Sequence, residues 1–146
     1  MNVKRRILVC GDRNWIDRRL ILNMLRNERD MIEAVIEGEC TGADVIARKA
    51  ADYLKIPVFA FPAEWDKHGR AAGPIRNTQM LREGKPDEIW AFHDRIRDSK
   101  GTKNMITQAL AKGILVTLIH HEKGNLGPIL SMQYTSSESF LKTVTG

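Results

Sequence analysis

The chain has 146 residues, of which 42% are hydrophobic and 28% charged, and its formal net charge is +5. A chain of this length forms one domain with a substantial core, and the composition is typical of a globular protein. No apolar run approaches the roughly 20 residues that span a membrane, and the run that follows the basic N-terminus, Ile7 to Cys10, is too short for a signal peptide. We therefore expect a cytoplasmic protein without a membrane partner.

The cysteines and the net charge limit the classes of ligand. Cys10 and Cys40 fit a reducing compartment, and without Cys-x-x-Cys spacing they predict no metal site. We expect neither a metal nor a cofactor. The positive charge fits an anionic partner, either a phosphorylated small molecule or a nucleic acid.

The first third of the chain predicts two strands and a helix. Residues 4–10 carry a continuous apolar run that is typical of a strand buried on both faces. A Gly-bearing loop, 11–15, follows it, and Asp17 is the expected N-cap of a helix that runs to about Glu28. A second strand is predicted over 32–37, and a second Gly-bearing loop over 38–42.

The middle of the chain repeats this alternation. Apolar residues recur at helical spacing over 43–54, and a third strand follows over 57–61. Pro74 suits the first turn of a helix that ends near Leu81. The fourth strand is predicted over 88–92.

The last third contains a charged loop, 93–100, a helix from Gly101 to about Lys112, and a fifth strand over 115–119. Residues 120–146 have few apolar side chains. We expect them to form a C-terminal extension of the 1–119 domain that packs on that domain or on a partner subunit.

Five strands that alternate with four helices indicate an α/β protein with a Rossmann-like, doubly wound parallel sheet. We expect the strand order 3-2-1-4-5, because right-handed crossovers leave few alternatives. Ligands of such folds bind beyond the carboxyl ends of the strands, at the point where the strand order reverses. This places the loops after strands 1, 2 and 4 at one site.

The segment 62–77 has the most unusual composition in the chain. It contains a Trp, a His, two Arg and an Asn among Ala and Gly residues, with few aliphatic side chains. Arg and Asn supply hydrogen-bond donors, Trp supplies a flat face, and Ala and Gly permit close backbone approach. The segment is either a ligand-contacting loop or an ordinary loop that precedes a helix.

Three Gly-bearing loops, at Gly11, at 38–42 and at Gly101-Thr102, lie between a strand and a helix. The free N–H groups of a helix N-terminus attract phosphate, so the three loops together favour a phosphorylated ligand. Glycines also occur in such loops merely to form tight turns. The sequence lacks the GxxxxGK[ST] and GxGxxG motifs of P-loop ATPases and dinucleotide-binding dehydrogenases.

Four motifs carry a resemblance to a known family: Gly11–Trp15, Glu37–Asp44, Ala63–Asn77 and Lys100–Thr102. Over about residues 4 to 119 the chain resembles the SLOG superfamily, and more narrowly its YspA-like branch, related to YpsA. The resemblance implies a Rossmann-like domain that binds a nucleotide or a nucleotide-derived ligand, and it implies a homo-oligomer. The superfamily includes the Lonely Guy phosphoribohydrolases, the DNA-processing protein DprA and sensor domains of bacterial and phage conflict systems.

The resemblance also has a departure. Lonely Guy enzymes carry a PGGxGTxxE motif, and here Gly101-Thr102 is present but Met105 stands in place of the glutamate. A thioether cannot replace a carboxylate as a general base or as a stabiliser of an oxocarbenium ion. We therefore do not expect phosphoribohydrolase activity by that mechanism.

The motifs supply the candidate site residues. Arg13 and Arg76 are expected to bind phosphate oxygens, and Trp65 either stacks on a base or lies in the core. Asn77 bonds either the ligand or the local backbone, and Asp44 either accepts from a ribose hydroxyl or caps its helix. The full set of predicted ligand-binding residues is Gly11, Arg13, Gly38, Gly42, Asp44, Trp65, Gly73, Arg76, Asn77, Gly101 and Thr102.

Three functions are consistent with this set. The first is a sensor or sequestering protein for a nucleotide-like small molecule. The second is a hydrolase of an N-glycosidic or related bond in such a ligand, with Glu64, Asp66 or His68 as candidate acid/base residues. The third, suggested by the net charge, is nucleic-acid binding of the DprA kind.

Overall fold

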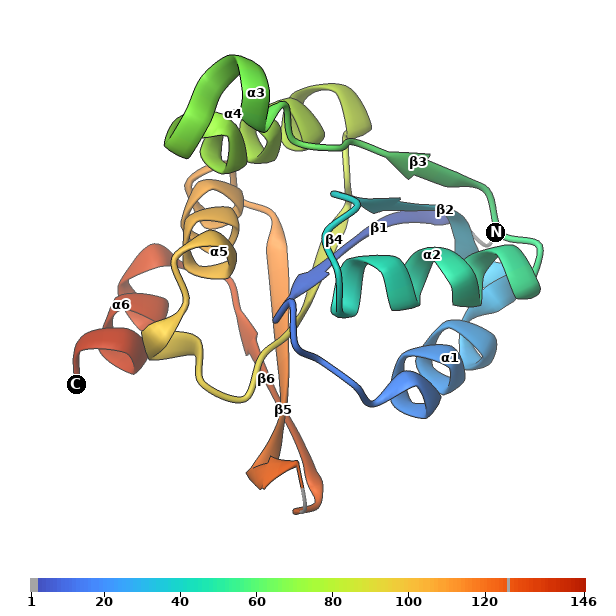
Figure 1. Cartoon of the computed structure of the whole chain (residues 1–146). Coiled ribbons are helices and arrows are strands. Elements are labelled where there is room, and N and C mark those ends of the chain that lie inside the picture. The colour runs from blue at the N-terminus through green and yellow to red at the C-terminus, as the bar shows by residue number, and fades with distance from the viewer. Residues whose placement is uncertain (1–2, 126) are drawn as a thin grey trace.

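The computed structural model describes residues 3–125 and 127–146. It contains a single sheet with the strand order β3-β2-β1-β4-β5-β6 and with helices on both faces (Figure 1). β1 to β5 are parallel, and β6 runs antiparallel to β5. The predicted α/β fold and the order of the five parallel strands are confirmed, but the sheet has a sixth strand that the sequence did not predict.

The elements alternate along the chain as expected. The strands are β1 (Arg5–Gly11), β2 (Ile32–Glu37), β3 (Val58–Ala60), β4 (Glu88–Phe92), β5 (Leu115–Asn125) and β6 (Ile129–Tyr134). The α-helices are α1 (Arg18–Asn27), α2 (Ala43–Tyr53), α3 (Trp65–His68), α4 (Ala72–Gln79), α5 (Gly101–Ala111) and α6 (Ser137–Thr145). None of the described helices is long and apolar enough to cross a membrane.

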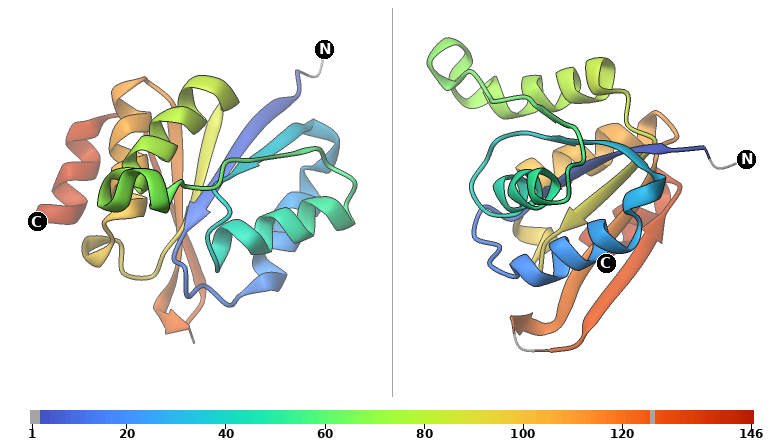
Figure 2. Two further views of the ribbon diagram at one scale, coloured as in Figure 1. Left: turned by 45° about the horizontal axis from the view of Figure 1, so that its top comes forward. Right: turned by 90° about the vertical axis from the view of Figure 1, so that its right-hand side faces the viewer.

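The sheet separates two hydrophobic cores. The central strand β1 contributes to both, because Ile7 and Val9 face one side and Leu8 faces the other, and all three are completely buried. One core lies under α1 and α2, and the other lies under α4, α5 and α6, on the opposite face of the sheet (Figure 2). Fully buried parallel strands require this cover on both faces, which explains the continuous apolar run of β1.

The C-terminal region departs most from the expected elements. β5 does not end at Ile119 but continues to Asn125, because β6 pairs with it from Val116↔Tyr134 to His121↔Ile129. Tyr134 of β6 and Phe140 of α6 are almost fully buried, and their ring centroids lie 5.3 Å apart. A few well-placed aromatic residues therefore anchor a region whose average composition is polar.

The segment 62–77 is more helical than expected. It forms α3, a 3-10 turn at Gly69–Ala71 and the start of α4, which begins at Ala72 and continues as a π-helical turn at Met80–Gly84. Pro74 lies in the first turn of α4, where its missing N–H would have no partner within the helix. This arrangement brings the polar side chains of the segment to the carboxyl ends of the strands.

Candidate functional site

A cleft of about 990 Å³ opens at the carboxyl ends of β1 and β4, next to the N-terminus of α5. The loops after β1, β2 and β4 and the first turn of α4 contribute to its walls. This is the position where the strand order reverses and where open α/β sheets bind ligands.

Most of the predicted ligand-binding residues lie together in this cleft. Those that line it are Gly11, Arg13, Asp44, Trp65, Gly73, Arg76, Asn77, Gly101 and Thr102. Gly38 and Gly42 do not line it; they lie behind its wall, where they permit close contacts between loops.

Arg76 is buried, and the protein itself occupies its donors. Its Nη1 donates to the Gly38 carbonyl at 2.6 Å, and its Nε donates to Asn77 Oδ1 at 3.0 Å. A Cβ at Gly38 would lie 2.5 Å from Nη1, so glycine is what lets the guanidinium reach the loop. The phosphate contact predicted for Arg76 therefore competes with the role of holding the loop after β2.

Asp44 supports the same loop from α2. Its Oδ2 accepts from the N–H groups of Gly38 and Cys40 at 3.2 and 3.3 Å. Burial raises the pKa of Asp44 to about 6, although the charge of Arg76 and these hydrogen bonds partly oppose the shift. We call Gly38, Asp44, Arg76 and Asn77 the Arg76 cluster.

Asn77 connects α4 to α5. Its Nδ2 donates to the Gly101 carbonyl at 3.3 Å and to Asn104 Oδ1 at 3.1 Å. At the start of α5, Ser99 Oγ accepts from the Thr102 N–H at 3.0 Å. These bonds fix the N-terminus of α5 against the cleft, where its positive dipole end favours an anion.

Three exposed cations of the cleft are available to a ligand: Arg13, Arg70 and Lys100. In the part of the chain that the structure describes, none of them forms an ion pair with a carboxylate, whereas Arg95 pairs with Asp98 at 3.0 Å. The sequence analysis identified Arg13 but missed Arg70 and Lys100, although both lie inside the quoted motifs. Lys100 could have been found because it directly precedes the predicted contact Gly101, and Arg70 because it is a basic residue between the predicted contacts Trp65 and Gly73.

Trp65 lies at the cleft with half of its surface exposed, so its ring is free to stack on a planar group. The catalytic candidates Glu64, Asp66 and His68 are its neighbours in sequence but do not line the cleft. The His68 ring instead lies 3.8 Å from the Glu64 carboxylate on α3.

Met105 and Cys10 also line the cleft. Met105 is buried there at the position of the absent glutamate, packed in the same core as Cys10. Burial, followed by the charge of Asp44, raises the pKa of the Cys10 thiol, so that it stays protonated. The described residues also contain no group of three or more His, Cys, Asp or Glu side chains that could hold a metal ion.

Glu37, at the end of β2, is a buried acid whose shifted pKa the sequence did not predict. Its side chain is fully buried: Oε1 accepts from the Glu39 N–H at 2.9 Å, and Oε2 has no partner among the described residues. Burial raises its pKa to about 8. Glu37 does not line the cleft, so it affects stability rather than ligand contact.

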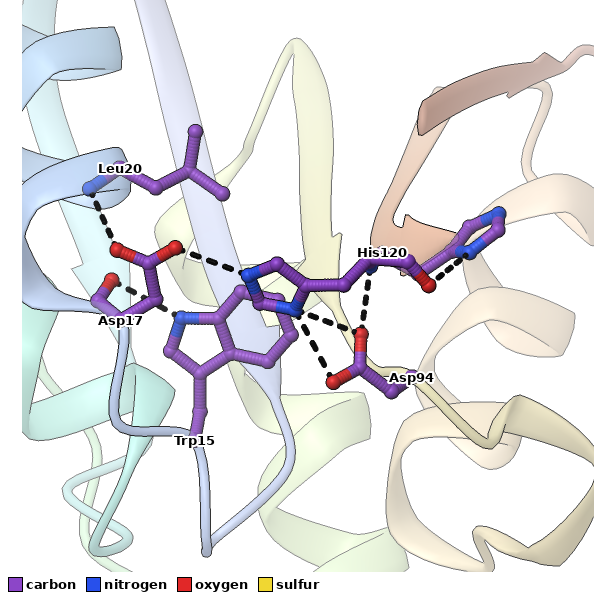
Figure 3. Close-up of polar contacts among 6 residues, drawn as sticks. Trp15, Asp17, Leu20, Asp94 and His120 are labelled. Atoms are coloured by element: carbon purple, nitrogen blue, oxygen red, sulfur yellow. Dashed lines mark hydrogen bonds and ion pairs between the residues drawn. The ribbon is translucent and has the colours of Figure 1, made fainter. Parts of the chain in front are cut away.

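A second polar cluster lies beside the cleft on the α1 side and consists of Trp15, Asp17, Asp94 and His121, which we call the His121 cluster. His121 Nε2 lies 2.9 Å from Asp17 Oδ2, and its Nδ1 lies 3.0 and 3.1 Å from the two Asp94 oxygens. Trp15 stacks on the His121 ring, with the ring centroids 4.9 Å apart. Asp17 also caps α1 as predicted, because its Oδ1 accepts from the Leu20 N–H at 3.1 Å (Figure 3).

No local pattern in the sequence reveals the His121 cluster. His121 meets Asp94 and Asp17 across 27 and 104 positions of the chain. Only the pairing of β6 with β5 extends β5 far enough to place His121 there. The sequence therefore predicted Asp17 as the N-cap of α1, but it did not predict that the His121 ring contacts the other oxygen of the Asp17 carboxylate.

The fold and the cleft define a class: a Rossmann-like domain with a cleft at the switch point of its sheet, lined in part by exposed cations. The sequence model of the YspA, cpYpsA-related SLOG family matches residues 5–68. The Gene 61 protein of Mycobacterium phage D29 is 33% identical over 120 residues, an alignment that covers 77% of this chain and 94% of the relative. The chain belongs to the YspA, cpYpsA-related SLOG family, as its motifs predicted.

Proposed function

We propose that this protein binds a nucleotide or a nucleotide-derived phosphorylated small molecule in the cleft, and that it acts as a sensor or sequestering protein. The observation that carries the proposal is the set of exposed cations, Arg13, Arg70 and Lys100, around the N-terminus of α5. Phosphate oxygens would accept from these side chains and from the helix N-terminus. Trp65 at the rim supplies a face on which a base stacks.

Native mass spectrometry of the purified protein, followed by denaturation and analysis of any released molecule, tests this proposal. We expect a nucleotide-like species or, for an empty protein, a mass gain from AMP, ADP, ATP or GTP. Lys100→Ala and Arg70→Ala should each raise the Kd about tenfold, because each removes a charge-assisted contact. Lys103→Ala is the matched control, because Lys103 lies on the same helix as the site but outside the cleft.

An empty protein that gains no mass from the panel would overturn the small-molecule proposal. A Kd that is unchanged in both Lys100→Ala and Arg70→Ala would overturn the site. Tight binding to an oligonucleotide, with a Kd that rises steeply with salt, would identify nucleic acid as the anion instead. The same native spectra report the mass of the assembly, which tests the predicted homo-oligomer.

Turnover is the second candidate function, and Asp44 is the observation in its favour. Asp44 lines the cleft and has a pKa of about 6, which is near the value at which a carboxyl group works as a general acid. Incubation with the same nucleotides should then release a base or a sugar phosphate, and Asp44→Asn should abolish the release. Binding without any product would leave the protein a sensor or sequestering protein.

A further inference from the structure

The His121 cluster joins three segments that are far apart in the sequence. Asp17 belongs to the β1–α1 segment, Asp94 to the loop after β4, and His121 to β5. His121 is almost fully buried, and both of its ring nitrogens contact a carboxylate (Figure 3). Its backbone N–H also donates to Asp94 Oδ1 at 2.7 Å.

This geometry requires the charged form of the ring. A neutral imidazole has one N–H donor, whereas an imidazolium has two. Since each nitrogen faces a carboxylate oxygen, only the doubly protonated ring donates on both sides. Burial opposes the charged form, but the hydrogen bonds that the ring donates to Asp17 and Asp94 outweigh it, so the pKa of His121 is raised.

The segments held by the His121 cluster are also walls of the cleft. In the β1–α1 segment, Asp12, Arg13 and Asn14 line the cleft, and the residues that follow, Trp15 and Asp17, contact His121. In the loop after β4, His93 and Arg95 line the cleft on either side of Asp94. In each wall, the residues that line the cleft and the residue that contacts His121 therefore lie within six positions of one another in the sequence.

We propose that His121 is the positioning residue of the cleft: as an imidazolium it holds the β1–α1 segment and the loop after β4 in place, and its deprotonation releases the β1–α1 segment and weakens anion binding. The first half of this inference rests on geometry alone. The second half rests on the proposed function, because it needs an anion in the cleft.

Loss of one ring proton from His121 affects its contacts with Asp94 and with Asp17 differently. Asp94 keeps the backbone N–H of His121 and two contacts to Nδ1, so the remaining ring proton stays on that side. Asp17 then faces the lone pair of Nε2, and repulsion replaces the hydrogen bond. Asp17 and Asp94 are the charged groups that face the ring. On its own strand the neighbour is His120, and opposite it on β6 lies Ile129.

The decisive experiment needs no ligand. NMR titration of the histidine Cε1–Hε1 signals gives the pKa of His121, and hydrogen exchange gives the protection of residues 12–20 and 93–98 on both sides of that pKa. We expect His121 to titrate above the ordinary 6.5, and we expect protection of 12–20 to fall about tenfold as the proton leaves. Protection of 93–98 should change less.

Asp17→Asn tests whether the charge of the His121 ring, or only its packing, holds the β1–α1 segment in place. Asn keeps the N-cap, and its amide can donate to the neutral Nε2, so the segment stays held without the proton. We expect this variant to lower the pKa of His121 and to remove the pH dependence of 12–20 protection. His121→Gln should also remove it, whereas His120→Gln, the same change one position away, should retain it.

A His121 pKa at or below 6.5, or a pH dependence that survives in Asp17→Asn, would overturn the inference. Affinity for AMP and ATP is then compared on both sides of the measured pKa. If AMP and ATP bind, the Kd should rise with pH in the natural protein and stay flat in Asp17→Asn; a parallel rise in both would overturn the link to binding. If exchange behaves as expected but neither nucleotide binds, the proposed function fails and the positioning role stands.

Discussion

Two buried cations hold the loops around the cleft, one on each face of the sheet. Arg76 fixes the loop after β2 on the α4 side, and His121 fixes the β1–α1 segment on the α1 side. Their side chains are similarly buried, with 8% and 7% exposed. They differ in chemistry, because a guanidinium stays charged at every physiological pH and an imidazolium does not.

The cleft therefore has one wall held by a permanent cation and one wall held by a cation that depends on pH. The carbonyl and amide partners of Arg76 do not titrate, so its contacts persist as pH changes. The contacts of His121 depend on a proton. A group whose folded pKa is raised adds stability below its unfolded pKa and loses that stability as pH rises through the folded pKa.

Arg76→Ala should produce the largest loss of stability. It leaves the Gly38 carbonyl and Asn77 Oδ1 without their donor and the buried Asp44 without a nearby cation. Removal of one member of a buried charged network costs about 4 kcal/mol. Urea denaturation at pH 7 measures the change. Arg70→Ala is the control, because this exposed cleft residue should change the unfolding free energy by less than about 0.5 kcal/mol.

An equal small effect of Arg76→Ala and Arg70→Ala would contradict the assignment. It would mean that the loop after β2 keeps its shape without the guanidinium. Arg76 would then be free to bind phosphate, as the sequence analysis expected.

Glu37→Gln should remove the titration of another buried group, Glu37. The pKa of Glu37 is about 8 in the fold, against about 4.3 in an unfolded chain. The folded state therefore holds the proton more tightly, and stability falls as pH rises from about 4.3 to 8. We expect the unfolding free energy of the natural protein, relative to that of Glu37→Gln, to fall by about 4 kcal/mol over this range.

Urea denaturation at several pH values measures this slope. Glu33→Gln is a matched control on the same strand, because Glu33 is exposed and its ion pair with Arg6 is a surface contact. That variant should retain the slope of the natural protein. A Glu37→Gln variant with an unchanged slope would show that Glu37 is ionised in the fold.

Gly42→Ala should disrupt the close contact between the two walls of the cleft, the loop after β2 and the β1–α1 segment. Gly42 has φ +83°, and a Cβ there would lie 2.2 Å from the Asp12 carbonyl oxygen and 2.5 Å from the Arg13 backbone. The loop after β2 and the β1–α1 segment would have to separate, at a cost of about 2 kcal/mol. Thermal or urea unfolding measures this loss.

Gly101→Ala is the control for the glycine prediction. No atom lies within 4 Å of a Cβ at Gly101, and the residue begins α5 with ordinary helical backbone. Alanine is the better helix former, so stability should be unchanged or slightly higher. A similar loss in both variants would indicate that close approach is not what requires Gly42.

Much of the fold could be predicted because it depends on local patterns. The buried run of β1 and the helical spacing of α2 determine their elements, and Asp17 marks the start of α1 by its own hydrogen bond. The strand order follows from the alternation of these elements and from right-handed crossovers. β6 could not be predicted, because five of its six residues are exposed and its pairing depends on a neighbour rather than on its own pattern.

The candidate site shows the same division. Motif residues such as Arg13 and Gly101 were identified from residue type and position, and the structure brings them to one cleft. The sequence could not show that Arg76 turns its donors toward Gly38, or that Glu64 faces His68 instead of the cleft. Side-chain direction depends on long-range packing, so residue type alone leaves these alternatives open.

The smallest effect that we expect is the contribution of His121 to stability. Measurements in the Glu37→Gln background isolate it from the titration of Glu37. The raised pKa of His121 adds stability below pH 6.5, and this contribution disappears as pH rises through the folded pKa. We expect Glu37→Gln to lose about 1 kcal/mol more than Glu37→Gln/His121→Gln between pH 6 and pH 9, the scale of one charged hydrogen bond. Arg76 itself contributes no such loss in either background, because its guanidinium does not titrate. An equal slope with and without His121 would mean that the α1-side wall is as permanent as the α4-side wall, and that the charge of the ring does not hold it.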